Sequence, residues 1–323
     1  MTKLFDAKPF IIAEIGSNFM SFNDAKDSIS FANAAGADAV KFQLFDELSL
    51  YGKYNGPRES MPGQLPIDWL PKLKEKADAC GIEFMCSAFS PELYDVVNPY
   101  VLVHKIASSE LTYPQTLDKV KSFKKPILLS VGGSSKGDIE QAMKHLRGGP
   151  QVVLMYCSSA YPSKRYNLFQ MQDLAATFSV PVGFSDHSID VIYPALSAFK
   201  HFGAVAIEKH VNYTHHSTPD SKHSLDSSEF KDMCDVLKGR KDFSNFNPQK
   251  EEHHMFLRNN RRLVAITDIS KGDSFRYGGN FGSFRTVSED VHGLSAFCWE
   301  NLVVSNGAKR DIKSGCGIGP GDF

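Results

Sequence analysis

The feature that most constrains the fold is a pattern repeated over residues 1–240: a short apolar run, a polar turn and an amphipathic stretch. The apolar runs favour buried β-strands, and the longer segments between them have helical spacing of apolar residues. Strands that alternate with helices are typical of parallel sheets, because parallel strands need a crossover connection. The sequence predicts eight strands, over Phe10–Glu14, Ala39–Gln43, Glu83–Ser87, Val103–Ile106, Pro126–Ser130, Val152–Tyr156, Val182–Ser185 and Ala204–Glu208.

Eight strand–helix units predict an α/β fold, a (β/α)8 TIM barrel. An open doubly wound sheet is the alternative. Dinucleotide-binding proteins with such a sheet carry a G-x-G-x-x-G fingerprint, whereas the glycine cluster here is only Val131-Gly132-Gly133. Several of the predicted helices end in Gly, as a helix stop does. We therefore expect a closed barrel.

The character of the sequence changes after Leu237. Segment 241–261 is polar, contains Pro248 and lacks long apolar runs, so it predicts a linker. Residues 262–323 form a separate small β-rich domain on this interpretation. In it, the pattern DISKG at 268–272 recurs as DIKSG at 311–315, which predicts two similar turns. Asp and Gly fit turn geometry without any further role.

Composition excludes several classes of function. The chain has 36 Lys and Arg against 37 Asp and Glu, so neither nucleic acid nor an anionic membrane is expected as the main partner. Apolar runs fall short of the ~20 residues of a membrane span, and the start MTKLFDAKPF lacks the apolar core of a signal peptide. The six cysteines form no C-x-x-C pair, which favours reduced thiols. We expect a cytoplasmic protein.

One strand–helix–strand unit, Val182–Val211, concentrates candidate chemistry. Its two strands end in the motifs SDH and EKH. Neighbouring parallel strands end at the same edge, so His187 and His210 are expected close enough to share one metal ion. Side chains alternate along a strand, which puts Glu208 and His210 on one face and Lys209 on the other, in the helix layer or in solvent. A single histidine at a strand end is more often structural; the pair indicates a metal site.

The other predicted strand ends also carry polar side chains. Lys41 in ADAVKFQLF and Lys105 in VLVHKIAS lie within apolar runs, where an unpaired charge is costly, so each is expected to face an anion. Ammonium groups, hydroxyls and a two-histidine site indicate a substrate with phosphate and carboxylate groups. The strand-end residues are Glu14, Lys41, Gln43, Ser87, Lys105, Ser108, Ser130, Ser158, Ser159, His187, Glu208 and His210.

These motifs resemble the sialic acid synthases, which comprise N-acetylneuraminate synthases and their pseudaminate and legionaminate relatives. The resemblance extends over nearly the whole chain, and the tail, RRLVAITDISKGDSF with GAKRDIKSGCGIGPGDF, is similar to the antifreeze-like (SAF) domain of these enzymes. The matching stretches are IIAEIGSN (11–18), GADAVKFQ (36–43), HKIASSEL (104–111), KPILLSVGG (125–133), SSAYP (158–162), VPVGFSDHS (180–188) and AIEKHV (206–211).

The resemblance implies a transferase that condenses phosphoenolpyruvate with an N-acylated aldose such as N-acetylmannosamine, releasing phosphate and forming a nine-carbon 2-keto acid. A pseudaminate or legionaminate synthase, which uses a diacetamido-trideoxyhexose, is the alternative. The resemblance also implies a divalent cation, Mn²⁺ or Mg²⁺, held by His187 and His210. It further implies a domain-swapped homodimer in which Arg285 of one subunit reaches the sugar bound by the other.

Individual roles follow from the same resemblance. Glu14 and Asp220 match acids that contact the sugar, and Tyr161 could pack against it. Glu208 is positioned to assist proton transfer. With His187 and His210, Glu14 and Glu208 are the expected catalytic residues. Gln43 is a further expected substrate contact, and the residues implied to hold phosphoenolpyruvate are Lys41, Ser87, Lys105, Ser108, Ser130, Ser159 and Ser185.

Some residues depart from the family pattern, mostly on the sugar side. Phe19-Met20 replace a His-Asn pair, and Thr286-Val287 replace the Pro-Gly that usually follows Arg285. Asn55 is the only candidate in segment 51–66 for the family's sugar-binding Asn. The reaction type is therefore better supported than the identity of the sugar.

Three alternatives remain open at this point. A Schiff-base aldolase with Lys105 as the nucleophile is disfavoured by the histidine pair. A non-catalytic sugar-phosphate binder is disfavoured by the intact set of strand-end groups. A phosphoenolpyruvate-condensing enzyme that acts on arabinose or erythrose phosphate would share the fold class, but the SDH and EKH motifs and the tail favour the sialic acid type.

Overall fold

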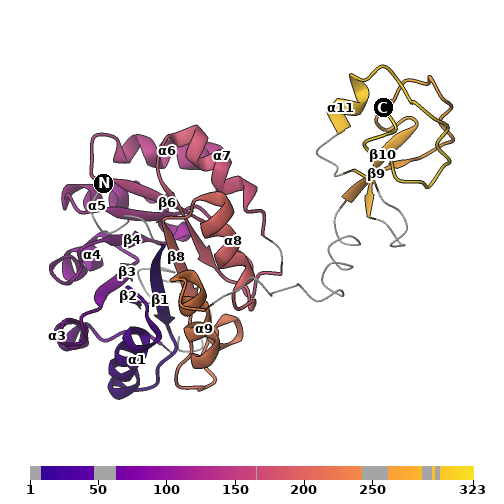
Figure 1. Ribbon diagram of the computed structural model, residues 1–323. Coiled ribbons are helices and arrows are strands. Elements are labelled where there is room, and N and C mark those ends of the chain that lie inside the picture. The colour runs from indigo at the N-terminus through magenta and orange to yellow at the C-terminus, as the bar shows by residue number, and fades with distance from the viewer. Residues whose placement is uncertain (1–8, 47–62, 165, 242–260, 286–292, 295–298) are drawn as a thin grey trace, which may run out of the picture. The chain divides into compact units, whose positions relative to one another are not determined.

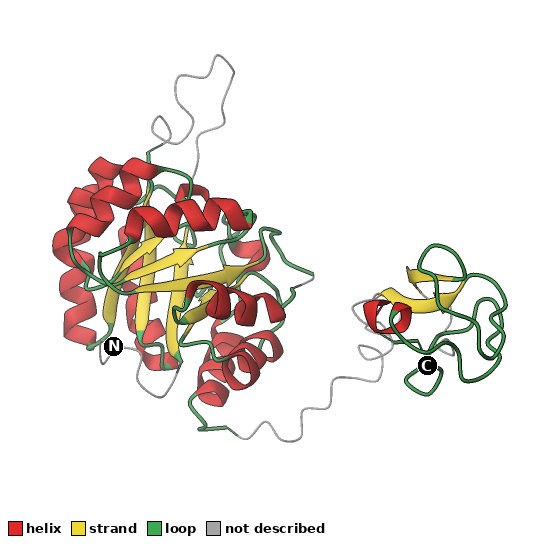
Figure 2. Cartoon of the chain, turned by 90° about the horizontal axis from the view of Figure 1, so that it is seen from above, coloured by secondary structure: helices red, strands yellow, loops and turns green. Residues whose placement is uncertain are grey.

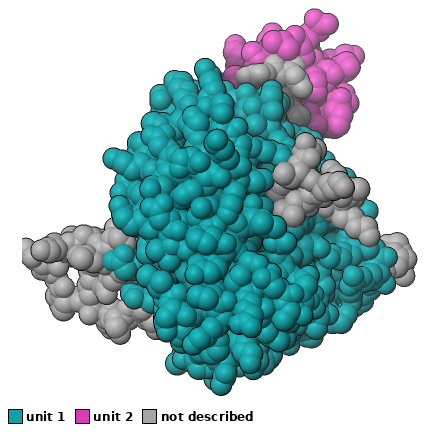
Figure 3. All heavy atoms as spheres, turned by 90° about the vertical axis from the view of Figure 1, so that its left-hand side faces the viewer, with its two compact units in different colours: residues 1–242 teal, residues 243–323 magenta. Residues whose placement is uncertain are grey.

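The computed structural model describes residues 9–46, 63–164, 166–241, 261–285, 293–294 and 299–323. The chain forms two compact units, unit 1 over Met1–Asp242 and unit 2 over Phe243–Phe323 (Figures 1 and 3). Most of the segment interpreted as a linker lies outside the described residues. Within the described ranges, none of the helices has both the length and the apolar character needed to cross a membrane.

Unit 1 is a closed barrel of eight parallel strands, each paired with the next along the chain and the last with the first. Pairing of the first and last strands sets Glu14 opposite His210. The predicted barrel and its eight strands are confirmed, with strand ends shifted by one or two residues. The strands are β1 (Phe10–Gly16), β2 (Ala39–Leu44), β3 (Glu83–Ala88), β4 (His104–Ile106), β5 (Ile127–Ser130), β6 (Val152–Cys157), β7 (Val182–Asp186) and β8 (Ala206–His210).

Helices surround the barrel strands, as the view in Figure 2 shows. They are α1 (Phe22–Ala35), α3 (Leu70–Cys80), α4 (Pro91–Val97), α5 (Pro114–Ser122), α6 (Lys136–Leu146), α7 (Phe169–Phe178), α8 (Tyr193–Phe202) and α9 (Ser227–Leu237). The first of these begins at a capping box of Ser21 and Asp24, which satisfies free backbone amides. As predicted, α1, α3 and α8 each end at a glycine with positive φ.

Alternation along the strands separates two apolar layers from one polar layer. Side chains such as Ile11 and Phe42 point outwards and are buried against the helices. Ile12, Met85 and Leu128 point inwards and pack together inside the barrel. Two residues further along each of these strands stand Glu14, Ser87 and Ser130, which are also buried. The barrel interior therefore changes from apolar to polar toward the carboxyl ends of its strands.

A buried ion pair fixes the connection from β7 to α8. Lys209 lies in the helix layer and is fully buried, on the opposite face of β8 from Glu208. Its Nζ donates to Asp186 Oδ2 at 2.7 Å and to the carbonyl oxygens of Ser188 at 2.6 Å and Asp190 at 2.9 Å. Asp186 thus points away from the barrel interior, which directs its neighbours Ser185 and His187 inwards.

The described part of unit 2 has a two-stranded antiparallel sheet of β9 (Arg261–Ala265) and β10 (Phe281–Arg285), and a short helix, α11 (Trp299–Val303). The two repeated turns bind each other: Ile269 and Ile312 exchange backbone hydrogen bonds of 2.8 Å. Asp268 accepts from the Ser314 amide and Asp311 from the Lys271 amide, both at 2.8 Å. The recurring aspartates therefore hold the turns together.

Candidate active site at the barrel mouth

Strand register gathers the predicted polar side chains into one layer at the carboxyl ends of the strands. Glu14 of β1 is opposite Lys41 of β2, and Ser87 of β3 is opposite Lys105 of β4. On the other side of the barrel, Ser185 of β7 is opposite Glu208 of β8. TIM barrels carry their active sites at this end, so the layer is the candidate active site.

Two buried lysines flank one carboxylate in this layer. Lys41 Nζ lies 2.6 Å from Glu14 Oε2 and donates to Ser87 Oγ at 3.1 Å. Lys105 Nζ donates to Ser130 Oγ at 2.8 Å. Glu208 Oε1 is 3.6 Å from the first ammonium group and 3.8 Å from the second. Both lysines therefore face carboxylates, and both keep a hydroxyl group within reach of an added anion.

Burial and pairing set the charges of these groups. Burial, only partly offset by Lys41, raises the pKa of Glu14 to about 7. Burial alone would also raise the pKa of Glu208, but Lys105 and Lys41 hold it below its usual value. Burial lowers the pKa of Lys105, whereas at Lys41 the two carboxylates outweigh burial and raise it. The positive charge of Lys105 is therefore less well balanced by neighbouring carboxylates than that of Lys41.

His187, directly after β7, is held by the loop that follows β6. Its Nδ1 donates to the Ser158 carbonyl oxygen at 2.7 Å, a bond that leaves the lone pair on Nε2. The hydroxyls of Tyr161 and Ser185 each lie 3.3 Å from Nε2, and the Tyr161 ring stacks on the imidazole with centroids 4.1 Å apart. Burial lowers the pKa of His187 to about 4, so the ring is neutral at pH 7.

A second group converges beside it, around His210 at the end of β8. His210 Nδ1 lies 3.9 Å from Asp220 Oδ2, and His223 Nε2 lies 3.5 Å from Asp220 Oδ1. Gly16 makes room for this carboxylate, because a Cβ there would lie 2.2 Å from Asp220 Oδ2, which accepts from the Ser17 amide at 2.8 Å. Sequence reasoning missed His223; the available signal was its three-residue spacing from Asp220.

The donor set fits a divalent cation. One atom each of His210, Asp220 and His223 lies within 4.8 Å of the others. His210 Nδ1 and His223 Nε2 are buried and have no hydrogen-bond partner among the described residues. The His187 ring centroid is 5.8 Å from that of His210. Imidazole nitrogens and a carboxylate are ligands of first-row transition metals, so a metal would satisfy these buried atoms.

The remaining predicted residues lie at varied depths. Gln43 donates to Glu14 Oε1 at 2.7 Å and so belongs to the layer. Ser108 begins the 3₁₀ helix η4 (Ser108–Glu110) and is half-buried. Ser159 is exposed and lies against Gly133, where a Cβ would be 2.8 Å from its Oγ. Arg285 is the last residue of β10, in unit 2.

The sequence departures are accommodated differently. Phe19 is buried, with ring centroids 6.2 Å from Phe42 and 6.1 Å from Trp69, so it extends the core beneath the mouth. Met20 beside it is 67% exposed. Asn55, Thr286 and Val287 lie outside the described residues.

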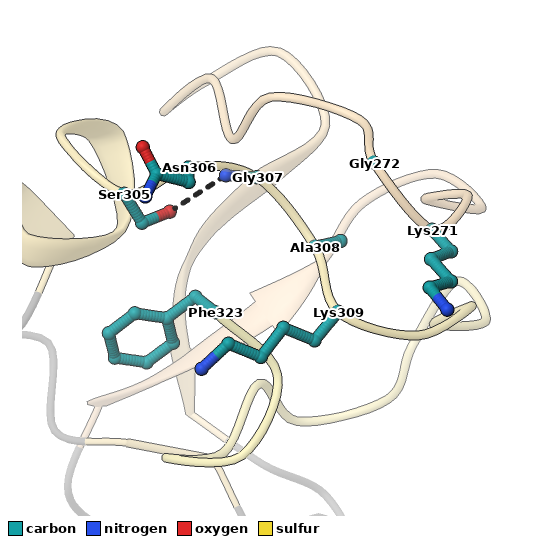
Figure 4. Close-up of a pocket in the computed structure, with 8 residues that line it drawn as sticks. All are labelled: Lys271, Gly272, Ser305, Asn306, Gly307, Ala308, Lys309 and Phe323. Carbon is teal, nitrogen blue, oxygen red and sulfur yellow. Dashed lines mark hydrogen bonds between the residues drawn. The ribbon is translucent and has the colours of Figure 1, made fainter.

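Unit 2 contains a separate hollow of about 590 Å³. Its polar side chains include Lys271 and Lys309, both exposed, and the Gly307 amide donates to Ser305 Oγ at 3.4 Å in its wall (Figure 4). None of the predicted catalytic residues lines it. The buried titratable groups that could perform chemistry lie at the barrel mouth, so the barrel mouth is the candidate active site and this hollow is not.

Comparison with known proteins gives consistent results. The model of the NeuB family matches residues 28–243. The N,N'-diacetyllegionaminic acid synthase of Campylobacter jejuni is 33% identical over 92% of this chain and 95% of its own length. A pseudaminic acid synthase of the same species is 30% identical over 98% of this chain and 97% of its own.

Solved structures agree with this. The N-acetylneuraminic acid (sialic acid) synthetase of Leptospira borgpetersenii, in complex with citrate, superposes with a TM-score of 0.66 and 27% identity, covering 78% of this chain and 92% of that one. The matched profile spans most of the barrel, and one relative matches almost the whole chain at 33% identity. The chain belongs to the NeuB family.

Proposed function

We propose that this chain condenses phosphoenolpyruvate with an N-acylated aldose and water to give a nine-carbon 2-keto acid and phosphate. The observation that carries the proposal is the pair of buried ammonium groups, Lys41 and Lys105, on either side of Glu208 and next to the imidazole cluster. An anionic three-carbon substrate and a polarised sugar aldehyde could meet there. Three relatives support the same reaction, because they are named as synthases of N,N'-diacetyllegionaminic acid, pseudaminic acid and N-acetylneuraminic (sialic) acid.

Phosphoenolpyruvate needs two anion sites a few ångströms apart. Lys105 with Ser130 would form one, and Lys41 with Ser87 the other, by charge-assisted hydrogen bonds to the phosphate and carboxylate. Glu14 and Glu208 partly balance the positive charges of Lys41 and Lys105. The phosphate and carboxylate groups of the substrate would take over that role on binding. The serines Ser108, Ser159 and Ser185 are further proposed contacts.

His187 and His210 would hold a divalent cation, Mn²⁺ or Mg²⁺, which when bound polarises the sugar's open-chain aldehyde. The chain's own residues position the sugar around it. Asp220 and Glu14 would accept hydrogen bonds from hydroxyl groups, and the ring of Tyr161, which is 54% exposed, offers an apolar face to the sugar. The bond from His187 Nδ1 to the Ser158 carbonyl oxygen orients the imidazole, so that Nε2 faces the hydroxyl groups of Tyr161 and Ser185.

The bond changes follow from this placement. C3 of phosphoenolpyruvate attacks the aldehyde carbon, the C2–C3 double bond supplies the electron pair, and the aldehyde oxygen becomes a hydroxyl group. Water adds to the electron-poor C2 while Glu208 accepts one of its protons. The C2–O bond to phosphate then breaks, and phosphate leaves with that oxygen and takes up the proton of the new C2 hydroxyl group, which becomes the keto group. The proton that Glu208 accepted balances the one that the aldehyde oxygen gained, so the carboxylate is restored. Glu208 Oε2 has no hydrogen-bond partner among the described residues, so it is available to the water.

The sugar and the assembly are finer parts of the proposal. N-acetylmannosamine is the first candidate, and the two Campylobacter relatives support a diacetamido-trideoxyhexose as the alternative. We place the enzyme in the cytoplasm as a homodimer, in which Arg285 of one subunit contacts the sugar of the other, and in which unit 2 serves as an antifreeze-like cap.

The test uses chelator-stripped protein with Mn²⁺ restored, phosphoenolpyruvate, and each candidate sugar in turn. We expect phosphate release that depends on one sugar and equals the amount of a nine-carbon acid detected by mass. Phosphate release without sugar, or none with any sugar although phosphoenolpyruvate binds, would contradict the proposal.

One observation favours a second candidate. Lys105 is buried with a lowered pKa, which is also a property of lysines that form Schiff bases. An aldolase of that kind would retain a 2-keto acid on Lys105 after borohydride reduction. Unmodified Lys105 in the same experiment supports the synthase.

A further inference from the structure

Among the described residues, His223 is a buried histidine at the barrel mouth that the proposed chemistry does not use. It is the last residue of the 3₁₀ helix η5 (Ser221–His223), on the segment between β8 and α9. The residue is only 6% exposed, and its ring is edge-on to His210 with centroids 4.6 Å apart. A buried imidazole whose ring nitrogen makes no hydrogen bond is costly, so this position calls for a bound partner.

The segment that carries His223 is tied to the barrel. The Leu225 amide donates to the His210 carbonyl oxygen at 3.0 Å. Asn18, after β1, donates to Ser224 Oγ at 2.8 Å and to the Val211 carbonyl oxygen at 3.0 Å. These bonds hold His223 at a fixed distance from β8. The short distance between His223 and His210 is therefore determined by the backbone of this segment.

We propose that His223 is a further protein ligand of the divalent cation, which it binds together with the Asp220 carboxylate and with His187 and His210 of the proposed site. This inference rests on the proposed function only in taking a cation as part of the site. His210 Nδ1 and His223 Nε2, which have no hydrogen-bond partner among the described residues, lie 3.9 Å and 3.5 Å from the two oxygens of the Asp220 carboxylate. One donor atom of each of the three residues lies within 4.8 Å of the others. Donors about 2.1 Å from a shared ion lie at most about 4.2 Å apart, so these side chains are close to the spacing that a shared ion requires.

The ligand set decides which metal the site prefers. Two or three imidazoles with one carboxylate suit Mn²⁺, Co²⁺ or Zn²⁺, whereas Mg²⁺ prefers oxygen ligands and retains water. The wild-type protein should therefore bind Co²⁺ more tightly than Mg²⁺ by a wide margin. Removing His223 should reduce that margin, because it removes a nitrogen ligand that Mg²⁺ uses little.

The test is a titration with metal alone, without substrates. Free Mn²⁺ is followed by electron paramagnetic resonance, and Co²⁺ by its visible absorption. His223→Phe keeps the ring and volume but has no donor atom, and His223→Ala is a second variant if Phe is not accommodated. His216→Ala removes an exposed histidine from the same segment and is the matched control.

We expect His223→Phe to weaken Mn²⁺ binding by about 10- to 100-fold, to change the Co²⁺ spectrum, and to lower the ratio of Co²⁺ to Mg²⁺ affinity, with His216→Ala unchanged. Wild-type Mn²⁺ affinity in His223→Phe and His223→Ala, together with lost binding in His210→Ala, would overturn this inference and leave the proposed function standing. Wild-type affinity in His210→Ala would overturn both.

Discussion

Glu208→Gln is expected to lower kcat by about 10²- to 10⁴-fold, the usual contribution of a general base. The KM for phosphoenolpyruvate should not rise, because the substitution removes a negative charge that lies 3.6 Å and 3.8 Å from the two lysines that would bind the substrate's anions. A residue that only shaped the site would instead change binding as well. Steady-state kinetics with phosphate release as the signal separates the two effects.

Glu14→Gln is the matched control, since Glu14 is the other buried carboxyl of the layer. It pairs with Lys41 and, in the proposed function, accepts a hydrogen bond from a sugar hydroxyl group instead of a proton from the attacking water. Its loss should affect kcat less than the loss of Glu208. A Glu208→Gln enzyme with kcat within tenfold of wild type would remove Glu208 from the mechanism.

Lys105→Met is expected to weaken phosphoenolpyruvate binding by about 10- to 100-fold, which corresponds to the loss of charged hydrogen bonds worth about 1.5–3 kcal/mol. The same change should shift the pH profile. Lys105 is the strongest of the charges that keep the pKa of Glu208 low, against the opposing effect of burial, so that pKa rises without it. As pH falls, Glu208 then becomes protonated at a higher pH than in the wild-type enzyme. The pH at which activity falls on the acid side is therefore expected to be higher in Lys105→Met.

Calorimetric titration with phosphoenolpyruvate in the absence of sugar measures the binding, and kcat against pH measures the shift. Lys222→Met is the control, because Lys222 is exposed on η5 at the same end of the barrel. If Lys105→Met binds the substrate as tightly as the control does, the anion site lies elsewhere.

The fold was largely predictable because each strand is short, apolar and separated from the next by a helical stretch. In a parallel sheet the end of one strand lies beside the end of the next, so the sequence alone predicts that Lys41, Lys105, Glu208 and His210 belong to one layer. The strand ends were less predictable: β8 reaches His210 because it stays paired with β1 up to Glu14, a contact between the two ends of the barrel.

The positions of residues outside the strands could not be predicted from strand order. His223 reaches the site through the fold of the segment after β8, which hydrogen bonds to Asn18 and His210 determine. Nothing in local periodicity encodes that path. Similarly, Phe19 stands where the family pattern has a histidine, which by sequence suggests that a polar side chain is missing beside the sugar. In the structure the Phe19 ring is buried against Phe42 and Trp69.

Condensation with cleavage of the C–O bond of phosphoenolpyruvate can be followed with an isotope label in the bridging oxygen. Phosphoenolpyruvate with ¹⁸O between C2 and phosphorus is incubated with the enzyme, Mn²⁺ and the accepted sugar, and the phosphate is analysed by mass. We expect phosphate release to require the sugar and the phosphate to carry the label. Unlabelled phosphate, released with pyruvate and independently of sugar, would contradict it.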